Sequence, residues 1–246
     1  MRNFMINSST PKQGSQHVSY DPDVASRIIF DARNKIILKL MQKLDINNKT
    51  KILDVGCGRG DMLQLLFREG YTNLYGLDAD SSCTEKASKF GTIFNRPIED
   101  LDKLLPEQHF EVLICSHVLE HVSNPLFVLK LMVSKVSKYV FLVVPNTLSV
   151  NNIIRTIFMS RPPVNKGHLQ AWDTAHFLNL IQKAHLKPIS KTKTENVSFF
   201  PYRFFEKILG EKVILWIRRI DFLGFFLLPK VFPRFGTSII SVCKKS

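Results

Sequence analysis

Cysteine is scarce in this sequence: the 246 residues include four cysteines, and none lies in a C-x-x-C pair. This scatter favours reduced thiols over a disulfide framework or a cysteine-ligated zinc module. The chain also lacks any run of about 20 apolar residues, the length that spans a bilayer. Its first 23 residues lack the continuous apolar stretch of a secretory signal. From these absences we expect a cytoplasmic protein.

Acidic residues are few in the second half of the chain. The formal net charge is +13, and residues 138–246 carry 17 Lys and Arg against 5 Asp and Glu, an excess of +12. Such a field favours an anionic partner, whether a phosphate-bearing substrate, an acidic membrane surface or nucleic acid. A basic surface that serves only solubility accounts for the same numbers. Composition leaves both interpretations open.

Strand-like and helix-like segments alternate from about residue 50 onward. Short apolar runs such as KILDV, NLYGLD, FEVLICS and YVFLVVP are separated by segments with helical patterns. Strand and helix units in this order require crossover connections, which build parallel sheets. The sequence therefore predicts a doubly wound, Rossmann-like α/β fold, with a mostly parallel seven-stranded sheet and helices on both faces.

The segments before the core read as an accessory region. Residues 1–49 begin with a polar, turn-rich arm to about residue 22, and residues 23–44 have the apolar spacing of an amphipathic helix. We expect this helix to lie against a core that occupies residues 50–195.

Residues 196–236 are dense in phenylalanine and carry many basic residues, and a strand-like segment follows at 237–246. The last strand belongs to the core sheet, so the aromatic segment is an insertion before it. Three interpretations fit its composition: a segment lying in a membrane interface, a lid over a lipid-like acceptor, or ordinary core. Its Arg218, Arg219 and Asp221 exclude a bilayer span.

A glycine turn follows the first predicted strand directly, in KILDVGCGRG. Gly56, Gly58 and Gly60 allow a tight bend and a close approach to a ligand. A dinucleotide fingerprint needs glycine at position 61, and a P-loop needs Lys followed by Ser or Thr, so this turn is neither. Asp78 ends the next strand, 20 residues past Gly58, where a carboxylate can accept hydrogen bonds from a ribose diol.

Asp54, the G-x-G-x-G turn and Asp78 together resemble the class I S-adenosylmethionine-dependent methyltransferases of the small-molecule type, over about residues 50–195. The stretch FEVLICSHVLEHVSNP is similar to that family's fourth-strand motif, and Pro97 stands where the family often has an aspartate for the adenine. The resemblance implies S-adenosylmethionine as the cofactor. It implies cofactor contacts from Asp54, Gly56, Cys57, Gly58, Gly60, Asp61, Asp78, Ala79, Ile98, Glu99, Cys115 and Ser116.

The sequence HVLEH at residues 117–121 matches the H-x-x-E-H pattern of some zinc proteases, which need both histidines on one helix face. Its position directly after an apolar strand argues against that chemistry. The ubiquinone-biosynthesis O-methyltransferases, which the chain also resembles, carry E-x-x-E-H here as a divalent-metal site. Glu120 and His121 match, but His117 replaces the first glutamate. The motif fits either a metal site or a pair that orients the loop, and we assign no metal ligand from sequence.

His168 lies in a segment that resembles the acceptor side of bacterial small-molecule methyltransferases. A histidine that titrates near neutral pH is suited to take a proton from an acceptor hydroxyl. His121 and His168 are therefore the candidate catalytic residues, although a hydrogen-bonded loop residue is the alternative for His168. Trp172 either walls the pocket or anchors the following helix.

These features predict a methyltransferase that acts, at oxygen, on a small or lipid-linked metabolite, with peripheral contact to an anionic membrane. An RNA methyltransferase is a second interpretation that the basic half suggests. Nucleic acid is disfavoured because the sequence has no RNP motif and no N-P-P-Y-type tetrapeptide after the fourth strand. A non-catalytic, cofactor-binding partner protein is the third interpretation.

Overall fold

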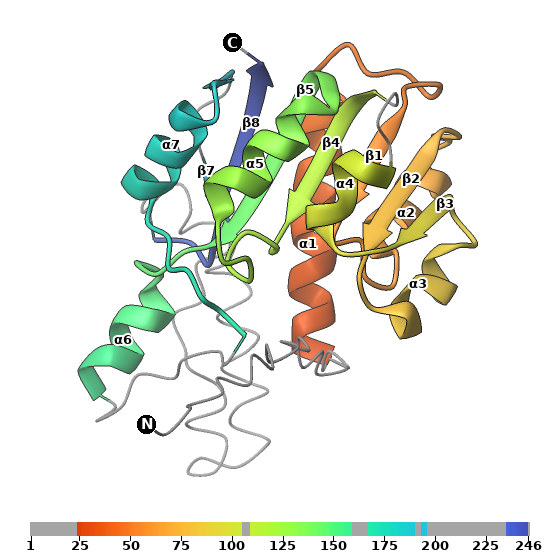
Figure 1. Ribbon diagram of the computed structural model, residues 1–246. Helices are drawn as coiled ribbons and strands as arrows, with labels where there is room; N and C mark the ends of the chain where they lie inside the picture. The colour runs from red at the N-terminus through yellow and green to blue at the C-terminus, as the bar shows by residue number, and fades with distance from the viewer. Residues whose placement is uncertain (1–23, 105–108, 159–166, 190–192, 196–234, 246) are drawn as a thin grey trace, which may run out of the picture.

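The computed structural model describes residues 24–104, 109–158, 167–189, 193–195 and 235–245 (Figure 1). The predicted N-terminal arm lies outside the described residues. The aromatic and basic segment also lies outside them, except for its last two residues.

The strands form one sheet that contains eight strands and is seven strands wide, in the order β3-β2-β1-β4-β5-β8-β6. They are β1 (Ile52–Val55), β2 (Leu74–Asp78), β3 (Thr92–Asn95), β4 (Phe110–Ser116), β5 (Val136–Pro145), β6 (Leu186–Pro188), β7 (Lys193–Glu195) and β8 (Ser238–Lys245). Strands β1 to β5 pair in parallel, and β8 is antiparallel to β5. The short strands β6 and β7 both pair antiparallel with β8, at its two ends. The predicted doubly wound, mostly parallel, seven-stranded sheet is confirmed.

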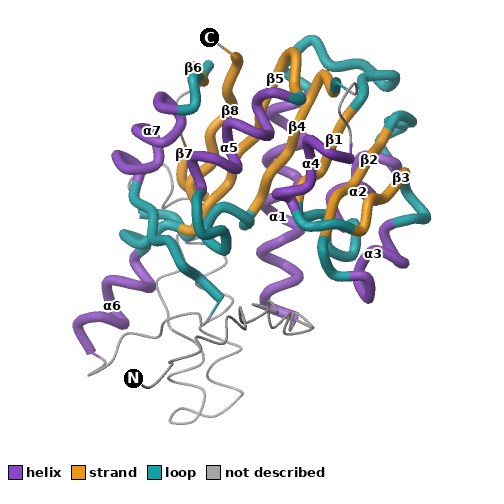
Figure 2. Tube along the Cα trace, in the orientation of Figure 1, coloured by secondary structure: helices purple, strands orange, loops and turns teal. Residues whose placement is uncertain are grey.

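Helices cover both faces of this sheet, with α5 and α7 on one face and α1 on the other (Figures 1 and 2). They are α1 (Val24–Met41), α2 (Asp61–Arg68), α3 (Ser81–Ala87), α4 (Leu101–Leu104), α5 (Pro125–Ser134), α6 (Val150–Phe158) and α7 (Thr174–Lys183), with a 3-10 turn η1 (Ile98–Asp100). Asp80, Asn124 and Asp173 cap α3, α5 and α7, because each side chain accepts a hydrogen bond from a backbone N–H in the first turn.

Two apolar layers hold the helices to the sheet, and the alternation along β5 shows how. Val140, Leu142 and Val144 point into the layer that also contains Leu129 of α5 and Phe177 of α7. The intervening side chains point into the opposite layer, together with residues of α1 and α2: Phe141, Val143, Ile37, Met41 and Leu63. Successive strand residues face opposite sides of a sheet, so this strand is buried on both faces. The expected packing of the N-terminal helix against the core is confirmed.

Three elements were not predicted. α6 begins after Ser149, whose Oγ accepts a hydrogen bond from the N–H of Asn152 at 3.3 Å. The strands β6 and β7 have three residues each, too short for a readable alternation of side chains.

In the part of the chain that the structure describes, no helix is long and apolar enough to cross a membrane.

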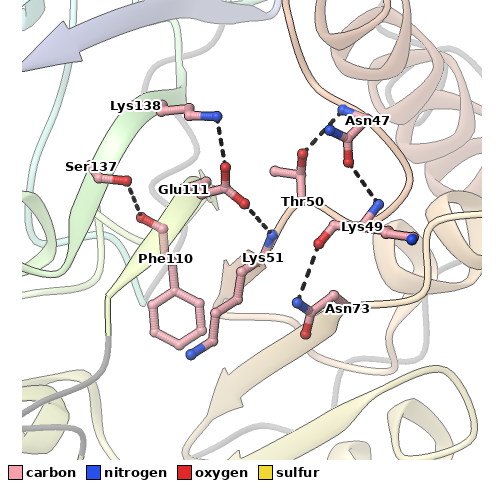
Figure 3. Close-up of polar contacts among 9 residues, drawn as sticks. All are labelled: Asn47, Lys49, Thr50, Lys51, Asn73, Phe110, Glu111, Ser137 and Lys138. Carbon is pink, nitrogen blue, oxygen red and sulfur yellow. Dashed lines mark hydrogen bonds and ion pairs between the residues drawn. The ribbon is translucent and has the colours of Figure 1, made fainter.

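The amino ends of the parallel strands form a closed polar edge (Figure 3). Glu111 Oε1 lies 2.7 Å from Lys138 Nζ, and Glu111 Oε2 accepts a hydrogen bond from the Lys51 N–H at 3.1 Å. The Ser137 hydroxyl donates to the Phe110 carbonyl at 3.2 Å. The Lys138 ammonium and the Lys51 amide hold the pKa of Glu111 below its usual value. Both carboxylate oxygens at this edge therefore have protein partners.

Candidate active site

The predicted cofactor residues gather at the opposite edge, where the parallel strands end. β1 lies between β2 and β4, with Val55 in register with Leu77 on one side and with Cys115 on the other. The glycine turn after β1, Asp78 at the end of β2 and Ser116 at the end of β4 therefore lie at one edge of the sheet. This is where ligands bind in open α/β sheets.

The glycine turn uses backbone conformations that suit glycine, since Gly56, Gly58 and Gly60 have φ angles of +72°, +50° and +82°. A Cβ at Gly56 would lie 2.2 Å from Val118 Cγ2, and one at Gly60 would lie 2.8 Å from Ala87 Cα. Within the described residues, no atom lies within 4 Å of a Cβ built at Gly58. Two of the glycines are therefore required by packing, and the third borders open space among the described residues.

Asp78 joins the glycine turn to the loop after β2. Its Oδ2 accepts a hydrogen bond from the Gly58 N–H at 2.8 Å, and its Oδ1 accepts one from the Asp80 N–H at 2.9 Å. A carboxylate has about four lone-pair positions, so capacity remains for a ligand's hydroxyl groups. Ala79, another predicted cofactor contact, is exposed beside it.

Asp54 lies buried beneath this turn, at 4% exposure. Burial, and next the charge of Asp78, raise its pKa to about 8, while the Arg33 guanidinium acts in the opposite direction. Arg33 belongs to α1 and is itself 7% exposed. Sequence analysis did not identify Arg33 as a site residue. The signal was present, because Arg33 precedes the buried Ile37 by four residues and so shares its helix face.

The two cysteines near the turn are packing residues. Cys57 and Cys115 are 7% and 0% exposed, and burial raises the pKa of each thiol. Both thiols are thus neutral, and neither has the depressed pKa of a nucleophile. The Cys115 side chain lies in the apolar core, so the predicted cofactor contact of Cys115 would come from its backbone. The neighbouring Ser116 hydroxyl is buried without a hydrogen-bond partner among the described residues.

Two further predicted residues follow β3 in the 3-10 turn η1, where Ile98 is half-buried and Glu99 exposed. Because β3 pairs with β2 and Asn95 is in register with Asp78, η1 begins three residues beyond the same edge of the sheet. This places Ile98 and Glu99 on the side of the site that borders Asp78.

The HVLEH segment forms the loop between β4 and α5 and contains no helix. His117 has a φ of +58°, which is uncommon for a residue with a side chain and is typical of functional sites. Its Nδ1 lies 3.1 Å from Glu120 Oε1, and its Nε2 lies 3.1 Å from Ser238 Oγ of β8. The motif therefore lacks the single helix face that the zinc-protease interpretation needs.

Glu120 is completely buried, with 0% exposure. Its Oε1 lies 3.1 Å from His117 Nδ1, and no group among the described residues forms a well-aligned hydrogen bond with either carboxylate oxygen. Burial raises its pKa, but His117, a backbone N–H and His121 together outweigh burial, so the net pKa is lowered. The loop therefore holds a buried negative charge.

The predicted catalytic pair meets beside Glu120. The rings of His121 and His168 form an edge-to-face contact with centroids 4.8 Å apart. The Leu169 N–H donates to the Glu120 carbonyl at 2.7 Å, and His121 Nδ1 lies 2.8 Å from the Gly167 carbonyl oxygen. Burial lowers the pKa of His168, against the charge of Glu120. His168 is therefore neutral near pH 7, as either a base or a metal ligand requires.

Trp172 is buried and packs against α7. Its side chain is 7% exposed and contacts Phe177 with ring centroids 6.0 Å apart. Its carbonyl accepts hydrogen bonds from both the N–H and the hydroxyl of Thr147, each at 2.8 Å. This supports the second of the two roles considered for Trp172.

A family model described as a methyltransferase domain matches residues 25–191. Among curated relatives, a ubiquinone biosynthesis O-methyltransferase of Rickettsia felis is 34% identical over 93 residues, which cover 36% of this chain and 38% of that protein. An uncharacterized protein of Haemophilus influenzae is 34% identical over 84 residues, 30% of this chain and 33% of that protein. The chain thus spans little more than a third of the length of these relatives.

Solved structures share the fold over most of the chain. A magnesium protoporphyrin IX methyltransferase from Synechocystis with bound S-adenosylhomocysteine superimposes with a TM-score of 0.62 at 13% identity, over 92% of this chain and 90% of that one. An S-adenosylmethionine-dependent methyltransferase from Archaeoglobus fulgidus has a TM-score of 0.57 at 20% identity, over 89% and 99%. At these identities the likeness establishes the fold.

Proposed function

The chain belongs to the methyltransferase-domain family, as its resemblance predicted, and on that premise we propose that it transfers a methyl group from S-adenosylmethionine to an oxygen of a small or lipid-linked metabolite. One observation carries the proposal. The glycine turn is tied to Asp78 by a 2.8 Å hydrogen bond, at the same sheet edge as the His121–His168 pair.

The residues at this edge fit the cofactor. Gly58 borders open space, and Asp78 retains lone pairs for ribose hydroxyls. The buried carboxylate of Glu120 favours a cationic ligand, and the buried guanidinium of Arg33 suits a carboxylate. When bound, S-adenosylmethionine supplies an activated methyl group on a positively charged sulfur. The protein then has to position the acceptor in line and exclude water.

We expect the acceptor to bind beside the His121–His168 pair. A neutral imidazole at His168 can take the proton of a hydroxyl placed against it, and His121 is held in orientation by the Gly167 carbonyl. The relatives named as ubiquinone biosynthesis O-methyltransferases support oxygen as the methylated atom. Leu169, beside His168, is 62% exposed and offers an apolar surface to a lipid-like acceptor.

A lipid-linked acceptor fits a protein that contacts an anionic membrane surface. The charge excess of +12 lies in residues 138–246. Leu148, Ile157 and Leu169 in the same half are 51%, 69% and 62% exposed. Cations and exposed apolar side chains together favour interfacial binding. The chain should sediment with vesicles that contain phosphatidylserine at low salt and remain in solution at high salt; no sedimentation at low salt contradicts the membrane assignment.

The same charge excess supports RNA as a second acceptor class. The chain is to be incubated with methyl-labelled cofactor and fractionated lysate, and the label followed into lipid, small polar metabolites, RNA and protein. We expect label in the lipid or small-metabolite fraction, and label in RNA alone would replace our proposal with the second one. Asp78→Ala should abolish labelling, and the exposed Glu85→Ala on α3 serves as the matched carboxylate control. Failure of every fraction to take label contradicts the proposed activity.

A further inference from the structure

The loop that contains Glu120 lies between the glycine turn and the segment of His168. A Cβ built at Gly56 would lie 2.2 Å from Val118 Cγ2, so the Val118 side chain lies directly against the turn. Two residues further along, the Glu120 carbonyl accepts a hydrogen bond from the Leu169 N–H at 2.7 Å. The loop therefore contacts the cofactor turn on one side and the acceptor side of the site on the other.

This position relates Glu120 to one part of the cofactor. The methyl group to be transferred has to lie between the glycine turn, which holds the cofactor, and the acceptor oxygen beside His168, because the two reactants must meet in line. The positively charged sulfur is bonded to that methyl group. The charge of Glu120 also adds to burial in raising the pKa of the Cys115 thiol at the end of β4. We therefore expect the Glu120 carboxylate to lie near the sulfur of the bound cofactor.

The Glu120 carboxylate is a buried group that the protein does not satisfy by itself. It is 0% exposed, and no group among the described residues forms a well-aligned hydrogen bond with either of its oxygens. A buried charge without hydrogen bonds is costly, so proteins seldom retain one unless it pairs with a cation. His117 Nδ1 lies 3.1 Å from Oε1, but burial lowers the pKa of His117. This neighbour is therefore neutral near pH 7 and does not compensate the charge.

The cofactor and its product differ in charge at this place. S-adenosylmethionine has a positively charged sulfur, whereas the sulfur of S-adenosylhomocysteine is neutral. Their adenine, ribose and amino-acid groups are the same, so residues such as Gly58 and Asp78 that face these common parts cannot distinguish the two molecules. A buried negative charge near the sulfur can distinguish them, because Coulomb interactions are stronger where water is excluded.

We propose that Glu120 determines the specificity of the site for S-adenosylmethionine over S-adenosylhomocysteine. The inference rests on the proposed function for the identity of the ligand, and it adds the residue that distinguishes cofactor from product. The attraction to Glu120 is lost once the methyl group has been transferred, so the product dissociates more readily than the cofactor. Asp54, the other buried carboxyl of the site, does not share this role, because burial raises its pKa to about 8 and keeps it largely protonated near pH 7.

The test is calorimetric titration of the full-length chain, at pH 7 and with EDTA to keep divalent ions away from the carboxylate. The ligands are S-adenosylmethionine, S-adenosylhomocysteine and sinefungin, an analogue with a protonated amine in place of the sulfonium. Glu120→Gln should lower the affinity for the two cationic ligands by about tenfold or more and leave that for S-adenosylhomocysteine unchanged. The retained binding of S-adenosylhomocysteine shows that the variant is folded. Equal losses for all three ligands, or no loss for the cationic pair, overturn the proposal.

Two further variants separate charge selection from general damage to the site. Glu111→Gln makes the same change at the opposite edge of the sheet and should leave all three affinities unchanged. Asp78→Ala should weaken all three ligands equally, because they share the ribose.

The wild type gives a test that needs no substitution. It should bind sinefungin more tightly than S-adenosylhomocysteine, and tighter binding of the neutral ligand contradicts the role of Glu120. A wild type that binds none of the three ligands contradicts the proposed function itself, whereas binding without charge selection rejects only the role of Glu120.

Discussion

Carboxylates at the two edges of the parallel sheet differ in their hydrogen-bond partners. At the amino edge, the Lys138 ammonium and the Lys51 N–H contact both oxygens of Glu111 (Figure 3). At the carboxyl edge, Glu120 is more deeply buried, and no hydrogen bond from the described residues reaches its oxygens. Asp54, at the same edge, has a pKa raised to about 8.

Polar groups that the protein itself satisfies stabilise the fold, whereas buried groups left without partners need another explanation. The carboxyl edge also contains His117, whose φ of +58° is uncommon for a residue with a side chain, and non-glycine residues in this conformation cluster at functional sites. We therefore expect substitutions at the carboxyl edge to lower cofactor affinity or turnover, and substitutions at the amino edge to lower only the stability of the fold.

The largest effect is expected for His168→Ala. Loss of the imidazole removes the proposed base, so turnover should fall by about 100- to 10,000-fold. The affinity for S-adenosylhomocysteine should stay unchanged, because the glycine turn and Asp78 are untouched. Label transfer measures turnover and calorimetry measures the affinity, on the same preparation. Full turnover in this variant would contradict a catalytic role for His168.

Gly56→Ala should weaken cofactor binding next most strongly. The added Cβ would lie 2.2 Å from Val118 Cγ2, and the φ of +72° disfavours any side chain. We expect a loss of about 1 to 3 kcal/mol in stability and a cofactor affinity reduced by about tenfold or more. Gly70→Ala, at a φ of +89° outside the site, controls for strain alone. Equal cofactor affinities in the two variants would show that the turn has no special role.

Asp54 makes stability depend on pH at the carboxyl edge. Its pKa rises on folding from 3.8 to about 8, so the folded chain retains a proton that the unfolded chain has released. The stability it contributes is present below the unfolded pKa and is lost as the pH rises through about 8. Asp54→Asn should flatten this decline by more than about 1 kcal/mol. Urea unfolding of both proteins at about pH 5 and about pH 9 measures the decline in the free energy of unfolding. An equal decline in variant and wild type contradicts the raised pKa of Asp54.

Glu111→Gln should have the smallest effect. The pair with Lys138 is partly exposed, so its removal should cost less than about 1 kcal/mol in stability. Because folding lowers the pKa of Glu111, this contribution is present above the unfolded pKa and is lost as the pH falls through the folded value. Cofactor affinity should not change. A large loss of cofactor affinity would mean that the two edges are not independent.

Sequence predicted the features that rest on local pattern. The spacing of Gly56, Gly58 and Gly60 after an apolar strand, and the carboxylate at Asp78, located the site because strand ends of a parallel sheet meet at one edge. The alternation of strands and helices predicted the fold class, because crossover connections build a parallel sheet. The chemistry of histidine indicated His121 and His168 separately, but their edge-to-face contact is a feature of the structure alone.

Long-range contacts were beyond the sequence. Arg33 reaches the site only because α1 packs on the sheet, and His117 meets Ser238 across 121 residues of chain. The burial of Glu120 depends on the segment 167–170 that lies against its loop. Such contacts follow from tertiary packing, which leaves no periodic signature in a single sequence.

The most direct test of the carboxyl edge as a cofactor site is calorimetric titration of S-adenosylhomocysteine into the wild type, Asp78→Ala and Glu111→Gln. The account predicts one molecule bound per chain by the wild type, an affinity at least about tenfold lower for Asp78→Ala, and wild-type affinity for Glu111→Gln. A wild type that does not bind, or an Asp78→Ala variant that binds as tightly as the wild type, would contradict it.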